Sequence, residues 1–295
     1  MTANTVSTPS AAPKRAGMGR KKALTALNYT LTYAFMIFMA AVVIIPILYM
    51  FGLSVDANGD MYRTSFLPRE ISFEHIVFLF KDTPFLKWYG NTITLGIFNA
   101  LFIVLLVTPT AYAFSKLRFR GRKNYLMLFL VMQMFPGSMA MMAYYVLLNM
   151  FNLVSTLGGL LLVFSCAAVP GSVFMVKGFL DTIPTSLEEA AKLDGATRLQ
   201  CIWHIVLPLA LPMIGLIAVF GFSAPFGDYM LSSMLIRDTD KYLLALGIHN
   251  EFISGIYQNM PAFAAASILA GLPITVIYIL LQRMIFFGLR ASFTK

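Results

Sequence analysis

The side chains that could bind a partner or transfer a proton gather in one short polar stretch between two long apolar runs. Its charged residues are Glu188, Glu189, Lys192 and Asp194. Ser186 and Glu189 have the spacing of a capping box, in which each side chain accepts a backbone N–H at the start of a helix. Pro184 in front and Gly195 behind are residues that typically begin and end a helix. The stretch therefore predicts a short helix, which needs a surface to pack on because so few turns are not stable alone.

Residue patterns that would support catalysis or metal binding are missing from the printed sequence. It has no Gly-x-x-x-x-Gly-Lys-Ser/Thr phosphate loop, so this chain is not itself an ATPase. The three histidines, His75, His204 and His249, are scattered along the chain and do not predict a metal site. No nucleophile motif stands in a usable place. We expect a chain that is not an enzyme and that binds no cofactor or metal.

Composition places the chain in a membrane. Hydrophobic residues make up 59% and charged residues only 12%, whereas about a quarter of a soluble domain is charged. The net charge of +9 does not indicate a nucleic-acid partner, because basic residues in a membrane protein report its orientation. We therefore expect an all-α integral membrane protein that contacts the lipid bilayer and no nucleic acid.

Six apolar segments are long enough to cross a bilayer as helices of roughly 20 residues each. The charge-free run 124–176 must hold two of them, joined by a hairpin at 149–159. The expected parts are a basic tail at 1–27, a first transmembrane helix at 28–55, a loop with a short amphipathic helix at 56–87, a transmembrane core at 88–290 and a tail at 291–295.

Two patterns predict how the polar stretch joins the membrane helices. Thr197 and Gln200 form a second capping-box pattern, so a further helix is expected at 198–206. Pro208 and Pro212 are then expected to end that helix and to start the fifth membrane helix. Kinks, which fit either a passage or ordinary packing, are predicted at Pro136-Gly137, Pro170-Gly171 and Pro225.

The distribution of basic residues predicts the orientation of the chain. If both ends are cytoplasmic, 16 of the 22 Lys and Arg residues lie inside and 6 lie outside. The positive-inside rule then favours an N-in/C-in topology. The loop 179–206 is expected in the cytoplasm, and the loops 56–87 and 228–260 are expected outside.

The interiors of the six segments carry no Asp, Glu, Lys or Arg. Ion-coupled carriers usually need such a residue, so its absence from the sequence favours a neutral cargo such as a sugar. Side chains suited to sugar hydroxyl groups, which we expect along a substrate path, are Asn99, Gln133, Tyr144 and Tyr145. The same side chains could instead form hydrogen bonds between helices or anchor the chain at the bilayer surface.

A longer pattern resembles a known family. Residues 188–196, Glu-Glu-Ala-Ala-Lys-Leu-Asp-Gly-Ala, are preceded by Asp181-Thr182-Ile183-Pro184 and followed by Ile205-Val206-Leu207-Pro208. This string is similar to the EAA loop of binding-protein-dependent ABC importer permeases, and within them to the carbohydrate branch and its maltose-type second permease subunit. The chain departs from the family pattern at His204, at Gly227-Asp228 and in the tail 288–295.

The resemblance implies a type I ABC importer permease with a MetI-like core and a coupling loop at 179–206. In such permeases the loop docks on a cytosolic ATPase, and that separate subunit binds the ATP and Mg²⁺. The coupling residues implied here are Glu188, Glu189, Ala190, Ala191, Asp194 and Gly195. The two glutamates could also do no more than cap a solvated helix.

The outer loop 228–260 is polar and rich in Gly, Asn and Ser, which predicts a mobile protrusion. The resemblance implies that it reaches an extracytoplasmic solute-binding protein. The contact residues implied are Asn250, Ser254, Gly255 and Gln258. The alternative is a plain connecting loop.

Together these patterns predict one permease subunit of an ATP-driven importer for an oligosaccharide such as maltodextrin, located in the bacterial inner membrane. The implied partners are a homologous second permease, two ATPase subunits and the binding protein. The alternatives are an ABC permease for another solute such as glycerol phosphate, an ion-coupled carrier of a neutral solute, or a structural membrane subunit without a pathway.

Overall fold

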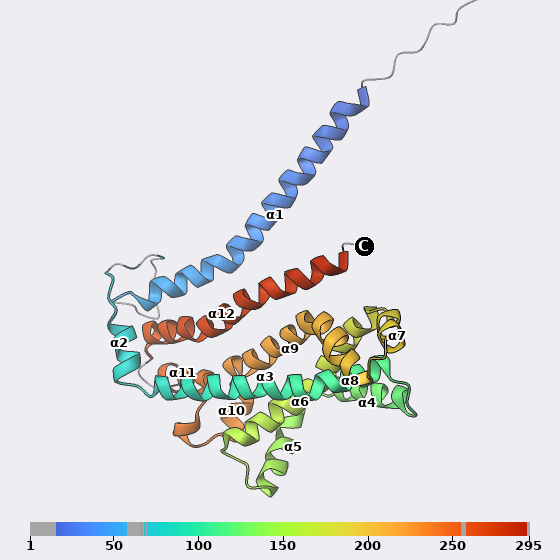
Figure 1. The fold of residues 1–295 in the computed structure, drawn as a ribbon. Coiled ribbons are helices and arrows are strands. Elements are labelled where there is room, and N and C mark those ends of the chain that lie inside the picture. Colours follow the sequence, from blue (N-terminus) through green and yellow to red (C-terminus); the bar gives the residue numbers. More distant parts are fainter. Residues whose placement is uncertain (1–15, 58–65, 67, 69, 255–257, 294–295) are drawn as a thin grey trace, which may run out of the picture. The chain divides into compact units, whose positions relative to one another are not determined.

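The structure is a computed structural model that describes residues 16–57, 66, 68, 70–254 and 258–293. Within these ranges the chain is helical and forms no strand apart from an isolated bridge between Asp56 and Ile71, so the predicted all-α class is confirmed. The elements in Figure 1 are α1 Ala16–Ser54, α2 Glu74–Lys81, α3 Phe85–Lys116, α4 Arg122–Met134, α5 Gly137–Met150, α6 Leu157–Thr182, α7 Thr185–Leu193, α8 Arg198–Cys201, η1 Ile202–Val206, α9 Leu207–Gly227, α10 Met230–Leu235, η2 Thr239–Lys241, α11 Leu244–Phe252 and α12 Met260–Phe293.

The chain divides into two compact units, 1–50 and 51–295, which are described one at a time. The first unit consists of most of α1. The apolar stretch 27–54 of this helix has 28 residues, and at 1.5 Å per residue that is about 42 Å, enough to cross a bilayer. This stretch lies close to the expected first transmembrane helix at 28–55.

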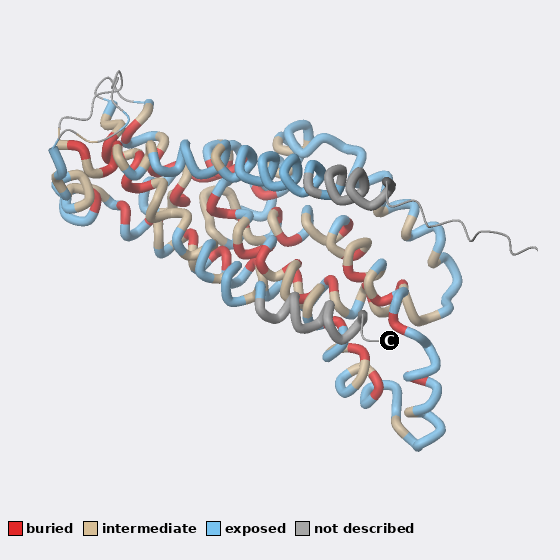
Figure 2. Tube along the Cα trace, turned by 90° about the horizontal axis from the view of Figure 1, so that it is seen from above, coloured by how far each residue is buried: buried red, intermediate tan, exposed pale blue. Residues whose placement is uncertain are grey.

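The second unit is organised around α3, α6 and α9, whose apolar faces meet in one core. Its buried residues include Ile103, Val107, Val173, Val176, Ile214 and Ile217. Small residues let α3 and α9 approach closely, since a Cβ at Gly221 would come within 2.8 Å of Ile103 Cδ1. Close packing of this kind holds membrane helices together, because lipid gives them little hydrophobic drive to associate. Figure 2 shows buried residues recurring along the helices between exposed ones.

The third predicted span is broken into two helices. α4 and α5 are bent by 100° at a break between Met134 and Gly137. Phe135 has an extended backbone with ψ 124°, as expected for a residue in front of a proline, which disfavours the helical region. The kink predicted at Pro136-Gly137 is therefore confirmed as a full break. Among the described residues, five helices can cross a membrane, or six if this bent pair is one span.

The prolines at the start of the fifth span do not interrupt it, contrary to the prediction. A π turn, η1, links α8 to α9, and the whole stretch Arg198–Gly227 qualifies as one 30-residue span. Leu207 N–H donates to the carbonyl of Ile202, five residues back. The wider π turn takes up the local irregularity next to Pro208, which lies in the first turn of α9 and needs no N–H partner there.

The loop at 228–260, which was predicted to lie outside, is folded over most of its described residues. α10, η2 and α11 pack against the core, and their buried side chains include Leu231, Leu235, Leu244, Leu246 and Phe252. A Cβ at Gly247 would overlap the indole of Trp88 on α3, so α11 lies tightly against that helix. The predicted mobile protrusion is therefore wrong for 228–252, because apolar residues at helical spacing bury this segment. Figure 1 places α7 and α11 at opposite ends of the second unit.

Candidate functional site

The short helix predicted from the polar stretch is α7, and it begins differently from the prediction. Its N-cap is Pro184, without a side-chain cap, and Leu187 N–H donates to the Pro184 carbonyl over 3.4 Å. Ser186 therefore lies inside the first turn with helical backbone and does not occupy the cap position. The capping box predicted for Ser186 and Glu189 is wrong, because the N-cap is Pro184, with ψ 132°, two residues before Ser186.

The other end of α7 is a tight, fully bonded turn. Gly195 has φ +88°, the left-handed region that glycine enters at little cost. Gly195 N–H donates to the Lys192 carbonyl over 3.1 Å, and Ala196 N–H donates to the Ala191 carbonyl over 2.9 Å. These two bonds make a Schellman motif. The prediction that Gly195 ends this helix is confirmed.

The helix that follows the turn carries the second predicted capping box. Gln200 N–H donates to Thr197 Oγ1 over 3.3 Å, and Thr197 N–H donates to Gln200 Oε1 over 2.7 Å. Both members are present, so this prediction is confirmed. α7, the Gly195 turn and α8 thus form a helix–turn–helix unit in which the end of α7 and the start of α8 are bonded by the unit's own residues.

The two neighbouring glutamates of α7 have opposite environments. Glu188 is buried at 5% exposure, whereas Glu189 is exposed. Glu188 Oε2 accepts a hydrogen bond from the Tyr112 hydroxyl over 3.2 Å, and Glu188 Oε1 lies 3.8 Å from Lys116 Nζ. Lys192 stands four residues after Glu188 on the same helix, but the Glu188 carboxylate faces the last turn of α3 instead.

The remaining predicted coupling residues form the outer surface of this unit. Ala190, Asp194 and Gly195 are exposed, and Ala191 is half-buried. Glu189 and these small residues leave a surface on which another protein can approach the backbone closely. Glu188 is not part of that surface.

A cleft of about 700 Å³ lies between α7 and the end of α3. Its walls include four basic side chains, Lys116, Arg118, Lys192 and Arg198, and two acidic ones, Glu188 and Glu189. The loop after α3 contributes Leu117, Arg118 and Phe119 to the same cleft. The cleft is therefore a mixed-charge depression beside the exposed face of α7.

The predicted substrate-path residues do not gather in one place. Asn99 is fully buried, donates to the Gly221 carbonyl over 2.7 Å and accepts from Ser165 Oγ over 2.9 Å. It therefore joins α3, α6 and α9, which is the helix–helix role left open by the sequence. Gln133 is exposed at the end of α4, and Tyr144 and Tyr145 pack beside the outer cluster that contains Leu148 and Leu160.

The predicted binding-protein contacts lie where α11 ends. Asn250, Ser254 and Gln258 are exposed, and Ser254 Oγ donates to the Asn250 carbonyl over 2.8 Å. Gly255 lies outside the described residues. The contact of these residues with a solute-binding protein stays a prediction.

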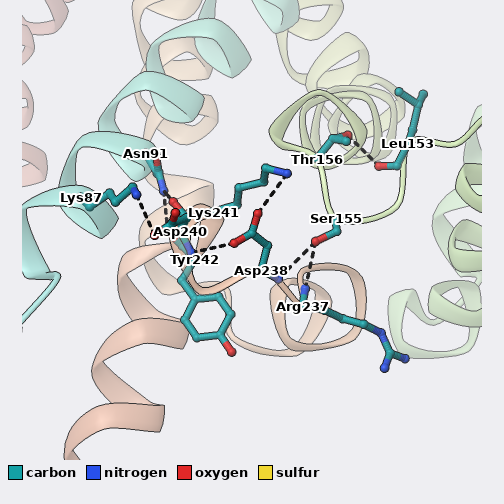
Figure 3. Close-up of polar contacts among 10 residues, drawn as sticks. All are labelled: Lys87, Asn91, Leu153, Ser155, Thr156, Arg237, Asp238, Asp240, Lys241 and Tyr242. Atoms are coloured by element: carbon teal, nitrogen blue, oxygen red, sulfur yellow. Dashed lines mark hydrogen bonds and ion pairs between the residues drawn. The ribbon is translucent and has the colours of Figure 1, made fainter.

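A polar cluster around η2, at the end of the second unit opposite α7 (Figure 1), was not predicted from the sequence. Figure 3 shows Lys87 and Asn91 of α3 pointing toward Asp240, with an ion pair of 2.7 Å from Lys87 and a hydrogen bond of 2.9 Å from Asn91 to the Asp240 carbonyl. Ser155 Oγ accepts the backbone N–H groups of Arg237 and Asp238 over 3.2 and 3.3 Å. The sequence feature that could have revealed this cluster is the close spacing of two acids and a lysine at 238–241.

One carboxylate of this cluster, that of Asp238, has a lowered pKa. The Asp240 N–H, donated to Asp238, holds the pKa of that carboxyl below its ordinary value, and the Lys241 side chain acts in the same direction. Lys241 Nζ lies 3.2 Å from Asp238 Oδ2. The cluster thus ties η2 to α3 and to the hairpin before α6.

Comparison with known proteins gives consistent matches. The model of the family "Binding-protein-dependent transport system inner membrane component" matches residues 108–291. The chain is 35% identical over 267 residues to the galactooligosaccharides transport system permease protein GanQ of Bacillus subtilis, covering 90% of this chain and 94% of that protein. It is 34% identical over 270 residues to the maltodextrin transport system permease protein MdxG of the same organism, covering 91% and 97%.

A more distant relative and a solved structure agree with these matches. The maltose/maltodextrin transport system permease protein MalG of Escherichia coli is 31% identical over 284 residues, covering 90% of this chain and 95% of that protein. A chain of a bacterial ABC transporter involved in the import of the acidic polysaccharide alginate superposes with a TM-score of 0.75. That chain is 23% identical, with 94% of this chain and 99% of that one covered, so it shows the shared fold.

Proposed function

Because this chain belongs to the family of binding-protein-dependent transport system inner membrane components, we propose that it is one permease subunit of an ATP-driven importer for an oligosaccharide. The chain is a multi-pass membrane protein and a non-catalytic transport subunit. Its proposed partners are a homologous second permease, two ATPase subunits that bind ATP and Mg²⁺, and an extracytoplasmic solute-binding protein.

The observation that carries the proposal is the α7 unit. It is a short helix with a bonded turn at Gly195, seated on the end of α3 and exposing Glu189, Ala190 and Asp194. The turn between α7 and α8 is held by its own hydrogen bonds, and the small residues of α7 permit close approach. With the N-in/C-in topology, this surface faces the cytoplasm, where an ATPase subunit can dock.

The cargo is proposed from the relatives and from the composition of the spans. Relatives at 31–35% identity are named for galactooligosaccharide and maltodextrin or maltose transport. The charge-free interior of the spans suits a neutral solute, since a charged or ion-coupled solute usually needs ionisable groups at membrane depth. An oligosaccharide satisfies both observations.

The outer side is proposed to receive the binding protein at the end of α11. Deletion of 254–258 combined with Asn250→Ala removes the exposed side chains of Asn250, Ser254 and Gln258 and leaves the buried Phe252 in place. We expect the deleted complex to assemble but to lose stimulation of ATP hydrolysis by the binding protein. Intact stimulation and uptake after this deletion would contradict the assignment of this surface.

Reconstitution of the purified complex into liposomes tests the whole proposal. We expect uptake of labelled oligosaccharides that needs ATP, Mg²⁺ and the binding protein and that survives an uncoupler. Uptake driven by an ion gradient without ATP would instead identify a secondary carrier. A panel containing maltodextrins, galactooligosaccharides and glycerol phosphate then identifies the cargo.

A further inference from the structure

The last turn of α3 holds α7 through a buried polar contact. Tyr112 and Lys116 are one helical turn apart, so their side chains lie on the same face of α3. Both reach the carboxylate of Glu188, with Tyr112 bonded to Oε2 over 3.2 Å and Lys116 Nζ 3.8 Å from Oε1. Lys116 Nζ also donates to the Ile183 carbonyl over 2.6 Å, at the turn from α6 to α7. One lysine therefore contacts both the start of α7 and its first acidic residue.

This contact is shielded from water. The side chains of Lys116 and Glu188 are only 5% and 7% exposed. Buried charges are expensive unless they are paired, and removal of one partner leaves the other uncompensated. Replacement of either partner by a neutral residue would therefore leave the other charge buried and unpaired, which costs more than the loss of a surface pair.

The contrast with Glu189 shows a division of roles. Successive residues of an α-helix point about 100° apart, since a turn holds 3.6 residues. Glu188 consequently faces α3 while Glu189 faces outward. The outward residue is available to a partner protein, and the inward one connects this surface to the membrane helices.

α3 can carry a displacement from this joint into the core. It packs with α6 and α9 through Ile103 and Val107, and Asn99 bonds to both neighbours. A force on α7 that passes through Glu188 and Lys116 thus acts on the helix at the centre of the bundle.

We propose that Lys116 and Glu188 are positioning residues that transmit movement of α7 into α3, with Tyr112 as a second anchor. This inference rests on the proposed function, because it assigns the route by which ATPase closure reaches the membrane helices. A stabilising role alone would affect how much complex assembles, whereas transmission affects how much solute moves per ATP hydrolysed.

The test compares variants in the complete reconstituted complex. Lys116→Met and Glu188→Gln are expected to co-purify with the ATPase and to lower uptake per ATP hydrolysed by about tenfold, within the usual range for coupling between sites. Tyr112→Phe is expected to give a smaller loss. Lys116→Arg retains the charge and the hydrogen-bond donors, so its uptake per ATP hydrolysed is expected to stay within about twofold of the unaltered complex.

Lys177→Met is the matched control. Lys177 forms an ion pair with Asp181 near the same end of the bundle, but both residues belong to α6. Loss of this pair removes a lysine and an ion pair without separating two elements. The ratio of uptake to ATP hydrolysis is therefore expected to stay unchanged.

Two results would overturn the inference. One is an unchanged ratio in both Lys116→Met and Glu188→Gln. The other is a fall in complex recovery and melting temperature that accounts for all lost uptake, with the ratio of the surviving complex intact. If the unaltered complex shows no ATP-driven uptake, the proposed function itself fails, so the two failures are distinguishable.

Discussion

Replacement of Gly195 tests the geometry of the α7 turn with little ambiguity. The residue has φ +88°, and a Cβ built there meets no other atom within 4 Å. Gly195→Ala therefore introduces no clash, and its whole effect is the strain of a left-handed backbone, about 1–2 kcal/mol. Since 1.4 kcal/mol is a factor of ten, the native turn should be populated about five- to thirtyfold less strongly relative to relaxed alternatives.

The assay for this prediction is the affinity of the purified ATPase subunit for the permease complex, measured by titration in detergent or nanodiscs. We expect Gly195→Ala to weaken binding by up to about thirtyfold. Gly195→Asn should weaken it less, because Asn tolerates the left-handed region. Gly195→Pro should abolish binding, because proline fixes φ near −65° and removes the N–H that bonds to Lys192.

The order of the three variants is the decisive result. Equal affinities of Gly195→Ala and the unaltered chain would refute the need for the left-handed turn. Weaker binding of Gly195→Asn than of Gly195→Ala would refute the backbone explanation and indicate a steric one.

Three further predictions concern other parts of the chain. Glu189→Lys should reduce co-purification of the ATPase, whereas Glu189→Gln, which keeps the shape of the side chain, should reduce it less; equal recovery of both with the unaltered complex would count against docking at this residue. Asn99→Leu removes the bonds to Gly221 and Ser165 and leaves their buried groups unpaired, so the complex should lose about 1–3 kcal/mol of stability, seen as a lower melting temperature; an unchanged melting temperature would contradict this. The pKa of Asp238 is lowered in the folded chain, so its charged form contributes stability above its ordinary pKa, and this contribution is lost as pH falls through the lowered value. Asp238→Asn should therefore lower the melting temperature at neutral pH but not at a pH below the lowered pKa. A difference in melting temperature that does not depend on pH would exclude titration of Asp238 as the cause.

Much of the fold follows from local patterns. Long charge-free runs located the membrane helices, and the Thr197–Gln200 spacing and Gly195 located two ends of the α7–α8 unit. These signals are short-range, so the chain itself specifies them. Prolines were less reliable predictors of helix breaks. Pro136 breaks a span, whereas the helix continues through Pro208, which follows a π turn. The difference depends on where the freed backbone groups find partners, which a local pattern does not contain.

The candidate site also has features that the sequence predicts and features that it does not. Its residues could be found from the sequence, but the opposite environments of Glu188 and Glu189 could not. Glu188 is buried because Tyr112 and Lys116, more than seventy positions earlier, lie against it. The segment 228–252 was predicted as mobile from its charged, Gly, Asn and Ser residues, although Trp88 on α3 provides a surface on which it packs.

The π turn has a mechanical consequence. Because η1 joins α8 to α9 without a break, Arg198–Gly227 is one continuous span of 30 residues, about 45 Å long. Asp228 follows its far end, and its carboxylate accepts the N–H and the hydroxyl of Ser232 at the start of α10, over 2.8 and 2.7 Å. A tilt of about 5° at α8 would displace that far end by about 4 Å. The two ends of the bundle are thus connected by one continuous element, so a small rotation beside α7 becomes a displacement of several ångströms beside α10.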